Sequence, residues 1–231
     1  MPAVRTIVVG LFYAVLLILL IPVIAVCALV GRRDPVIRVG QWAVRAGCRV
    51  LGIRLEVAGL ERVDPRASFV FMANHLSFLD GPIMGTVVRR PVRIILKKSI
   101  FRVPVLGTSM RFVGFVPVDR KGTKGGQKSL RRAARLMREK GYSFLLFPEG
   151  TRSRDGKIGR FRRGGFFLAL ESGAPIVPVT IGGTFELMPR GQWFARRGTA
   201  RIVFHEPVPV GEYSAATMDA LMERVRTAIT G

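Results

Sequence analysis

Hydrophobic residues form one long run near the start of the chain and several short runs after it. The long run, from Thr6 to Gly31, contains no charged residue. As a continuous helix it would measure about 39 Å, whereas the hydrocarbon core of a bilayer is roughly 30 Å thick. A signal peptide is the alternative, but its apolar region usually has only about 7–15 residues, and no clear small-x-small cleavage site precedes Gly31. The pattern predicts a membrane-associated helical segment.

Pro22 lies within this apolar run. A proline inside a helix removes a backbone hydrogen bond, so the run could cross the bilayer as a kinked helix or dip into it as two shorter helices. The sequence leaves both arrangements open.

The segment after the apolar run has a cationic amphipathic pattern. Four polar positions share one helical face, and four apolar positions lie towards the other: Arg38, Gln41, Arg45 and Arg49 against Val39, Ala43, Ala46 and Val50. Such a helix suits a surface of anionic lipid. The basic excess that begins at Arg32 and Arg33 predicts, by the positive-inside rule, that the chain after the apolar run lies on the cytoplasmic side of the cell membrane.

From about Leu55 onward, short apolar runs alternate with helical or Gly-rich stretches. This alternation predicts an α/β fold, a mixed sheet flanked by helices, with active residues where strands end and loops begin. We therefore divide the chain into a membrane-associating helical segment, 1–54, and an α/β domain, 55–231. The expected strands are Ser68–Met72, Val92–Leu96, Phe115–Val118, Ser143–Phe147, Ile176–Ile181 and Ala200–Phe204, and the clearest helices are Gln127–Lys140 and Ala215–Ile229.

The chain is strongly basic. Its 37 Lys and Arg against 15 Asp and Glu give a formal net charge of +22, which indicates an anionic partner such as phospholipid, nucleic acid or an acidic carrier. The hydrophobic content of 49% argues against a disordered basic tail. The two cysteines, Cys27 and Cys48, are too few for a disulfide framework and show no metal-ligand spacing.

One candidate catalytic loop follows the apolar run Phe69–Met72 and contains His75 and Asp80. An imidazole has an ordinary pKa near 6.5 and can take a proton from an alcohol, and a carboxylate partner would fix its tautomer. Within one straight helix the two residues would point about 140° apart, so they can meet only if His75 precedes the helix. Ser77 and Asp80 resemble a capping box that would begin the helix at Ser77. In the alternative interpretation, Asp80 is only a helix cap and His75 an ordinary loop histidine.

A second loop, Phe147–Ser153, also follows an apolar strand. Gly150 permits an unusual turn, and the guanidinium of Arg152 suits a phosphate. A tight turn with a solvated arginine is the alternative. A third segment places Asp119 and Arg120 at a strand end.

Other residues fit structural roles better. His205 lies in a strand-like run, and Ser153 is not part of a Gly-x-Ser-x-Gly motif. The segment Arg160–Arg163 mixes an aromatic residue with cations, but no nucleic-acid module accompanies it, so we expect a lipid- or thioester-facing role or plain solvation and no nucleic acid partner.

Together these segments resemble the glycerolipid acyltransferase family that contains the lysophosphatidic acid acyltransferases. The resemblance covers roughly residues 55–205. It rests on Asn-His-x-x-x-x-Asp at Asn74–Asp80, the Asp119-Arg120 pair, Phe-Pro-Glu-Gly-Thr-Arg at Phe147–Arg152 and Ile-Val-Pro-Val at 176–179, with a Lys97-Lys98 stretch between the first two motifs. The residues Val116-Pro117-Val118 depart from the family's usual sequence before Asp-Arg.

The resemblance implies a role for each motif. His75 would deprotonate the acceptor hydroxyl, Asp80 would orient His75, and the hydroxyl would attack an acyl thioester. Lys97, Arg120 and Arg152 would hold the acceptor phosphate. Glu149 and Gly150 would shape the pocket near His75, and Thr151 would also bind substrate. No metal or prosthetic group is implied, and the co-substrate would be acyl-CoA or acyl carrier protein.

Several alternatives stay open at this point. The resemblance implies lysophosphatidic acid as the acceptor, which would give phosphatidic acid. Glycerol 3-phosphate, a lyso-ornithine lipid or another lysophospholipid is the alternative acceptor. A different class of function is a basic membrane-surface protein that binds anionic lipid or nucleic acid without catalysis. The joint presence of His75, Asp80 and Glu149 favours the enzyme, because a binding module does not need a base paired with a carboxylate.

Overall fold

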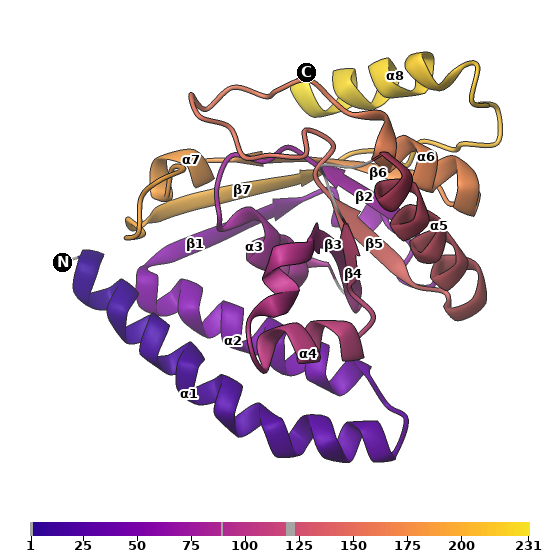
Figure 1. Ribbon diagram of the computed structural model, residues 1–231. Helices are drawn as coiled ribbons and strands as arrows, with labels where there is room; N and C mark the ends of the chain where they lie inside the picture. The colour runs from indigo at the N-terminus through magenta and orange to yellow at the C-terminus, as the bar shows by residue number, and fades with distance from the viewer. Residues whose placement is uncertain (1, 89, 119–122) are drawn as a thin grey trace.

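A mixed sheet with helices on both faces forms the centre of the molecule (Figure 1). The structure is a computed structural model and describes residues 2–88, 90–118 and 123–231. The seven-stranded sheet has the order β1-β7-β6-β2-β5-β3-β4. Its strands are β1 (Ile53–Ala58), β2 (Val70–Ala73), β3 (Val92–Lys97), β4 (Val116–Val118), β5 (Ser143–Leu146), β6 (Ile176–Gly182) and β7 (Gly198–Phe204). The expected mixed α/β sheet is confirmed.

The centre of the sheet is parallel. Strand β2 lies between β5 and β6, and Met72 pairs with Leu146 on one side and Pro178 on the other. Strands β3 and β4 continue the parallel order beyond β5, whereas β7 runs antiparallel to β6. The carboxyl ends of β2, β3 and β5 therefore meet at one edge, where loops can bring distant residues together.

Helices cover each face of the sheet with a separate hydrophobic cluster. On one face pack α5 (Thr123–Lys140), α6 (Arg163–Ser172) and α8 (Met218–Thr230). On the other face lie α2 (Asp34–Leu51) and α3 (Asp80–Val87), joined by part of α1 (Pro2–Leu29). Shorter elements complete the fold: η1 (Leu60–Arg62), η2 (Lys98–Arg102), α4 (Leu106–Phe112) and α7 (Thr184–Leu187). Every residue of β2 and β5 is buried, because both faces are covered.

All six expected strands are present, with ends shifted by a few residues at most. The prediction omitted β1, a strand at the sheet edge that is mostly exposed and lacks an apolar run. It also omitted α6, whose Gly164 and Gly165 weaken the helical pattern. In α6, a Cβ at Gly165 would lie 2.5 Å from a methyl carbon of Leu146, so the glycine permits close packing of the helix on β5. Tertiary packing therefore favours a helix that local propensity does not.

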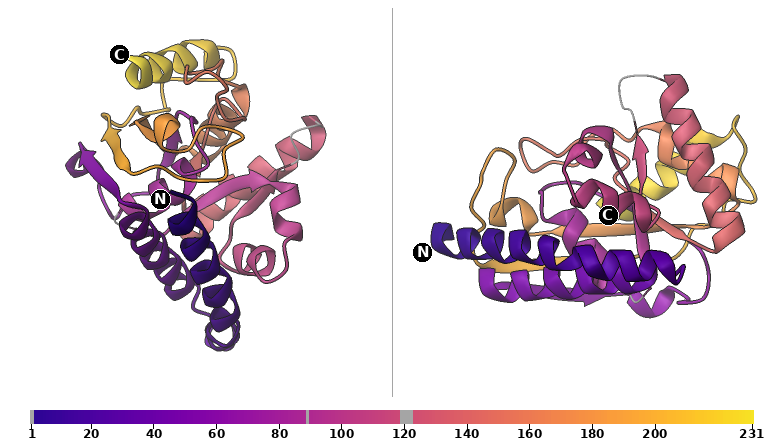
Figure 2. Two further views of the ribbon diagram at one scale, coloured as in Figure 1. Left: turned by 90° about the vertical axis from the view of Figure 1, so that its left-hand side faces the viewer. Right: turned by 60° about the horizontal axis from the view of Figure 1, so that its bottom comes forward.

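Helix α1 is one continuous helix through Pro22, so the division into two short helices did not occur. It lies beside α2 on the face of the sheet away from α5 (Figure 2). Both of its ends contact the rest of the protein. Near its start, Thr6 Oγ1 accepts a hydrogen bond of 3.1 Å from the backbone N–H of Ala195, and near its end, Cys27 packs with Val113. Only Val9, Leu20 and Cys27 of α1 are buried, which leaves a long hydrophobic surface exposed.

The expected faces of α2 need a correction. Gln41 and Arg45 donate hydrogen bonds to the carbonyl oxygens of Gly85 (2.8 Å) and Thr86 (2.6 Å), so two residues of the cationic face are directed to α3. Of the apolar positions, Ala43 is buried and Val50 is exposed. The helix instead turns inward the residues Val36, Ile37, Gly47, Cys48 and Leu51, because its contacts with α1, α3 and β1 determine its rotation.

Candidate active site

The loop after β2 brings His75 and Asp80 into direct contact. His75 Nδ1 lies 2.9 Å from Asp80 Oδ2. Asp80 is fully buried, and the backbone N–H groups of Leu76 and Ser77 donate to the same oxygen at 2.7 Å each. Three donors thus hold one carboxylate oxygen and fix the histidine ring against it. Because Asp80 occupies Nδ1, Nε2 is the ring nitrogen that can exchange a proton with a substrate.

The contact between His75 and Asp80 agrees with a histidine that precedes the helix, but the expected helix start was wrong. Helix α3 begins at Asp80, three residues later than Ser77. The hydroxyl of Ser77 accepts a hydrogen bond from the backbone N–H of Leu79 and donates one to the carbonyl oxygen of Met188. Ser77 therefore closes a local turn and connects the loop to the segment after α7.

The loop after β5 supports the loop of His75 from the side. The ring of His75 stacks on Phe147 with centroids 3.9 Å apart and planes 13° apart, and the His75 side chain is 15% exposed. The backbone N–H of Ser153 donates to the carbonyl oxygen of His75 at 2.8 Å. Stacking and hydrogen bonding together hold one face of the imidazole while leaving part of the ring open to solvent.

Glu149 connects the two loops through their backbones. Its Oε2 accepts a hydrogen bond of 2.7 Å from the N–H of His75, and its Oε1 accepts one of 3.0 Å from the N–H of Gly159. The residue is only 5% exposed. Burial raises the pKa of Glu149 from its usual 4.5 to about 7, although the two backbone donors act in the opposite direction. Both carboxylate oxygens are thus engaged in holding the loops.

Gly150 makes the turn of this loop possible. Its φ is +73°, and a Cβ there would lie 3.1 Å from Cδ of Arg162. The backbone N–H of Arg162 donates in turn to the carbonyl oxygen of Pro148 at 2.8 Å. A side chain at position 150 would strain the backbone and press on Arg162.

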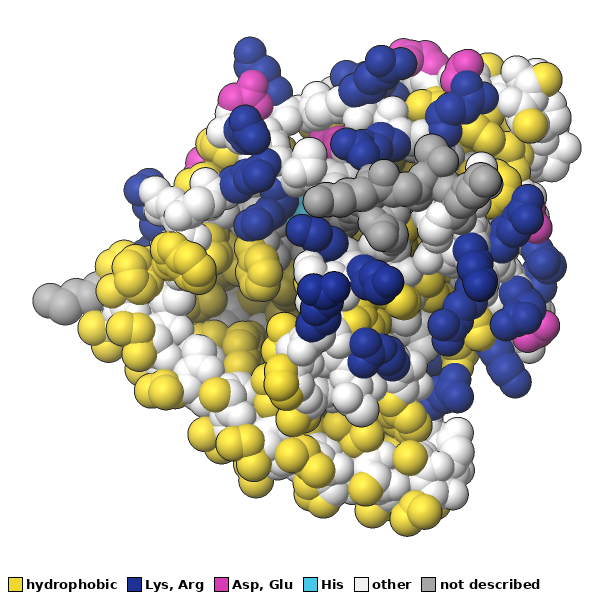
Figure 3. All heavy atoms as spheres, viewed as in Figure 1, with side chains coloured by type: hydrophobic (Ala, Val, Ile, Leu, Met, Phe, Trp, Pro, Cys, Tyr) yellow, Lys and Arg dark blue, Asp and Glu magenta, His cyan; other side chains and the backbone are white. Residues whose placement is uncertain are grey.

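A cationic cleft of about 1050 Å³ opens beside the two loops. Three of the expected substrate-binding residues line it: Glu149, Thr151 and Arg152. In Figure 3 blue Lys and Arg side chains gather on the upper part of the face shown. The further cations on the cleft wall are Arg154, Lys157, Arg160, Arg162, Arg163 and Arg190. The cleft can attract an anionic group close to His75.

One expected substrate-binding residue stands apart from this cleft, and another cannot be compared with it. Lys97 ends β3, next but one to β2 in the sheet, and its exposed side chain is not part of the cleft wall. Arg120, with its neighbour Asp119, lies outside the described residues.

Sequence reasoning missed several residues that shape the site. Asn74 is buried and forms two hydrogen bonds with the backbone of Ile181, at 2.8 and 2.7 Å, which tie the start of the His75 loop to β6. Its position next to His75 in the first motif was the available signal. Arg190 comes from the segment after α7, far away in sequence, and no local pattern marks it.

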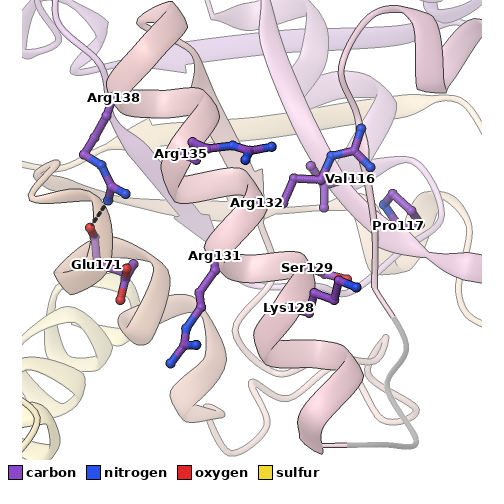
Figure 4. A pocket seen from close by; sticks show the side chains of 9 residues that line it. All are labelled: Val116, Pro117, Lys128, Ser129, Arg131, Arg132, Arg135, Arg138 and Glu171. Carbon is purple, nitrogen blue, oxygen red and sulfur yellow. Dashed lines mark hydrogen bonds between the residues drawn. The ribbon is translucent and has the colours of Figure 1, made fainter.

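A second basic cleft, of about 480 Å³, lies along α5 (Figure 4). Its walls carry five cations, Lys128, Arg131, Arg132, Arg135 and Arg138, together with Glu171 as the acidic residue. No histidine lines it. We therefore place the candidate active site at His75.

The fold and the site define an α/β enzyme domain that presents a histidine and carboxylate pair at the carboxyl edge of its sheet, next to a cationic cleft. The acyltransferase family model matches residues 54–182, which include both loops. The chain belongs to this family.

Known relatives share this region. The chain is 36% identical over 157 residues to the chloroplastic 1-acyl-sn-glycerol-3-phosphate acyltransferase BAT2 of Brassica napus. The aligned region covers 67% of this chain and 45% of the relative. It is 28% identical over 213 residues to the human 1-acyl-sn-glycerol-3-phosphate acyltransferase alpha, with 91% and 75% covered. The chain spans about half the length of the plant and algal relatives that it matches.

A solved structure is similar over nearly the whole chain. The crystal structure of the 1-acyl-sn-glycerophosphate acyltransferase PlsC from Thermotoga maritima has a TM-score of 0.81 and 25% sequence identity, and the match covers 99% of this chain and 95% of that one. The similarity includes the two N-terminal helices as well as the sheet.

Proposed function

We propose that this protein transfers an acyl group from an acyl thioester to the free hydroxyl of lysophosphatidic acid, giving phosphatidic acid. The observation that carries the proposal is the 2.9 Å contact between His75 Nδ1 and Asp80, next to a cationic cleft. The names of the plant, human and bacterial relatives support the same acceptor.

The proposed reaction needs one proton carrier. Nε2 of His75 takes the proton of the acceptor hydroxyl while its oxygen attacks the thioester carbonyl carbon. The C–S bond then breaks, and the imidazolium returns the proton to the leaving thiolate. Asp80 stabilises the imidazolium and holds the ring in place. An ester and a free thiol result, and His75 ends in its starting state.

Arg152 is the cation that we assign to the acceptor phosphate. It follows the Gly150 turn and lines the cleft, with its guanidinium 5.8 Å from the centroid of the Phe78 ring. A guanidinium can form two parallel charge-assisted hydrogen bonds with a terminal phosphate, whereas an ammonium acts as a point charge. Lys97 and Arg120 keep the proposed role of additional phosphate contacts.

The donor would be acyl-CoA or acyl carrier protein. Both are anionic, and the cations of the cleft, Arg160 and Arg163 among them, would attract either. We propose no metal or prosthetic group.

We also propose that the protein binds the cytoplasmic face of the cell membrane through α1. This helix is the one that, within the described ranges, is long and apolar enough to span a bilayer. However, its two ends both contact the α/β domain, through Thr6 and Cys27. A helix that crossed the bilayer would hold one of these contacts on the far side, so α1 lies along the membrane surface with its exposed side in the lipid.

A substrate panel tests the proposed function. The purified protein is given palmitoyl-CoA or palmitoyl-acyl carrier protein together with lysophosphatidic acid, glycerol 3-phosphate, lysophosphatidylcholine or lyso-ornithine lipid. Released thiol and lipid product are both measured. We expect fastest turnover with lysophosphatidic acid. Turnover only with another acceptor would contradict the assignment, and binding of anionic lipid without thiol release would support a non-catalytic protein.

A further inference from the structure

The segment between α7 and β7 carries the most exposed tryptophan of the chain. Trp193 is 82% exposed and its neighbour Phe194 is 45% exposed. Outside α1 and α2, four other large hydrophobic residues of the described chain are comparably exposed: Val30, Val57, Phe78 and Val103. Adjacent exposed aromatic residues of this size commonly mark a contact surface.

This segment is folded on both sides of the two aromatic residues. Before them, the N–H of Gln192 donates to the carbonyl oxygen of Pro189 at 3.1 Å, and after them, the N–H of Arg196 donates to that of Leu187 at 2.8 Å. Ala195, directly after Phe194, is 3% exposed. The backbone therefore holds Trp193 and Phe194 outward while the next residue is buried.

The segment adjoins the N-terminal end of α1. The N–H of Ala195 donates a hydrogen bond of 3.1 Å to Thr6 Oγ1. Arg5, from α1, and Arg197, from this segment, also meet at Gly52, because atoms of both side chains would lie within 3.3 Å of a Cβ placed on that glycine. Figures 1 and 2 show the connection from α7 to β7 beside the start of α1. The α1 residues Val4, Ile7, Val8 and Leu11 are each about half exposed or more. In Figure 3 the hydrophobic surface over α1 continues at this end onto the neighbouring segment.

We propose that Trp193 and Phe194 form a second membrane contact that inserts into the lipid interface beside α1. This inference rests on the membrane association proposed above and adds a contact site to it. Tryptophan prefers the interface between hydrocarbon and headgroups, and the exposed cations Arg190, Arg196 and Arg197 of the same segment suit anionic headgroups. Because Trp193 and Phe194 adjoin the exposed apolar surface of α1, which is itself proposed to lie in the membrane, a lipid surface fits them better than a protein partner.

The second contact would also orient the active site. The segment starts at Met188, whose carbonyl oxygen accepts the hydrogen bond of 2.7 Å from Ser77 in the catalytic loop. Two residues later, Arg190 lines the cationic cleft. Insertion of Trp193 would therefore hold the mouth of the cleft close to the membrane, where a lysolipid acceptor resides.

The chain allows a direct fluorescence test, because it has only two tryptophans. In Trp42→Phe protein, Trp193 is the sole tryptophan. On vesicles of phosphatidylcholine with phosphatidylglycerol we expect a blue shift of its emission, quenching by lipids with brominated acyl chains, and about fivefold or greater protection from acrylamide. If the protein floats with the vesicles but Trp193 keeps its emission and its acrylamide quenching, the proposal is wrong.

Substitutions separate membrane insertion from a structural role. In vesicle flotation, Trp193→Ser with Phe194→Ser should weaken binding by roughly tenfold, whereas Trp193→Phe should retain most of it. Equal melting temperatures of all variants are expected, since both side chains are exposed. Unchanged flotation of the double variant would contradict the proposal, as would a shift of Trp193 emission that depends on protein concentration without vesicles, which would indicate a second copy of the chain. None of these readouts depends on enzymatic activity.

Discussion

At the scale of single residues, three side chains have different roles in the proposed site. His75 exchanges the proton, Asp80 fixes its ring, and Glu149 fixes the backbone on which His75 sits. The spacing of His75 and Asp80 excludes contact within one helix and only permits it across a turn, so it was the resemblance to the acyltransferases that favoured them as a pair. It could not indicate what Glu149 contacts, because its partners are the backbone N–H groups of residues 74 positions before it and 10 after it.

The pKa of Glu149 leads to a prediction about stability. Because this pKa rises from 4.5 in the unfolded chain to about 7 in the folded protein, the folded state binds the proton more tightly. The stabilisation linked to this group is complete below about pH 4.5 and is lost as the pH rises through about 7. Denaturant unfolding at pH 5 to 8 should therefore show that the stability advantage of the native protein over Glu149→Gln decreases as pH rises. If the stability advantage stayed constant or grew with pH, burial would not be what sets the pKa of Glu149.

Arg152 gives a prediction about acceptor choice. Arg152→Ala should lower kcat/KM for lysophosphatidic acid by about 10²-fold or more, since each hydrogen bond to a charged group contributes roughly 1.5–3 kcal/mol. Activity with a lysolipid whose phosphate is capped by choline should fall much less, because fewer phosphate oxygens are free. Initial rates with both acceptors measure this, with Arg131→Ala on α5 as the matched control. Equal losses on both acceptors would mean that Arg152 supports the fold or the donor instead.

At the scale of secondary-structure elements, strands were easier to predict than the helices between them. Strands β2 and β5 are continuous apolar runs, so their presence was plain from the sequence. Helix boundaries were harder to predict, because the same side-chain hydrogen bond can form in a turn or at a helix start. The bond from the N–H of Ser77 to Asp80 lies in the turn before α3, which begins at Asp80 and not at Ser77. The rotation of α2 depended on its neighbours, and no local pattern contains that information.

A pair of adjacent glycines at the end of β6 tests the packing at the element scale. Gly183 has φ +80°, and a Cβ there would lie 2.2 Å from the carbonyl oxygen of Thr199, whereas a Cβ at Gly182 would meet nothing within 4 Å. We expect Gly183→Ala to destabilise the fold by about 2–4 kcal/mol through backbone strain and this clash, and Gly182→Ala to cost much less. Melting temperatures of the two variants decide this. Similar losses for both would show that β6 and β7 are not packed as described.

At the scale of the whole molecule, charge and hydrophobicity are separated in space. The exposed hydrophobic surface follows α1, whereas cations line the cleft beside the loop after β5 and the cleft along α5 (Figures 3 and 4). The net charge implied an anionic partner, and the uncharged run Thr6–Gly31 implied a membrane segment. It could not show that Thr6 and Cys27, at opposite ends of α1, both contact the α/β domain. That arrangement depends on long-range packing, and it favours a helix lying along the membrane surface.

The central claim is that His75 carries the proton in acyl transfer, and one measurement tests it most directly. Thiol release from the acyl thioester, in the presence of lysophosphatidic acid, is compared between the native protein and His75→Ala. Because a positioned base commonly contributes about 10²–10⁴-fold, we predict a loss of that size at an unchanged melting temperature. His205→Ala is the control, since His205 is the other histidine and bonds to Thr180 at 2.8 Å, in β6, outside the cleft wall. Near-native thiol release by folded His75→Ala protein would contradict the account.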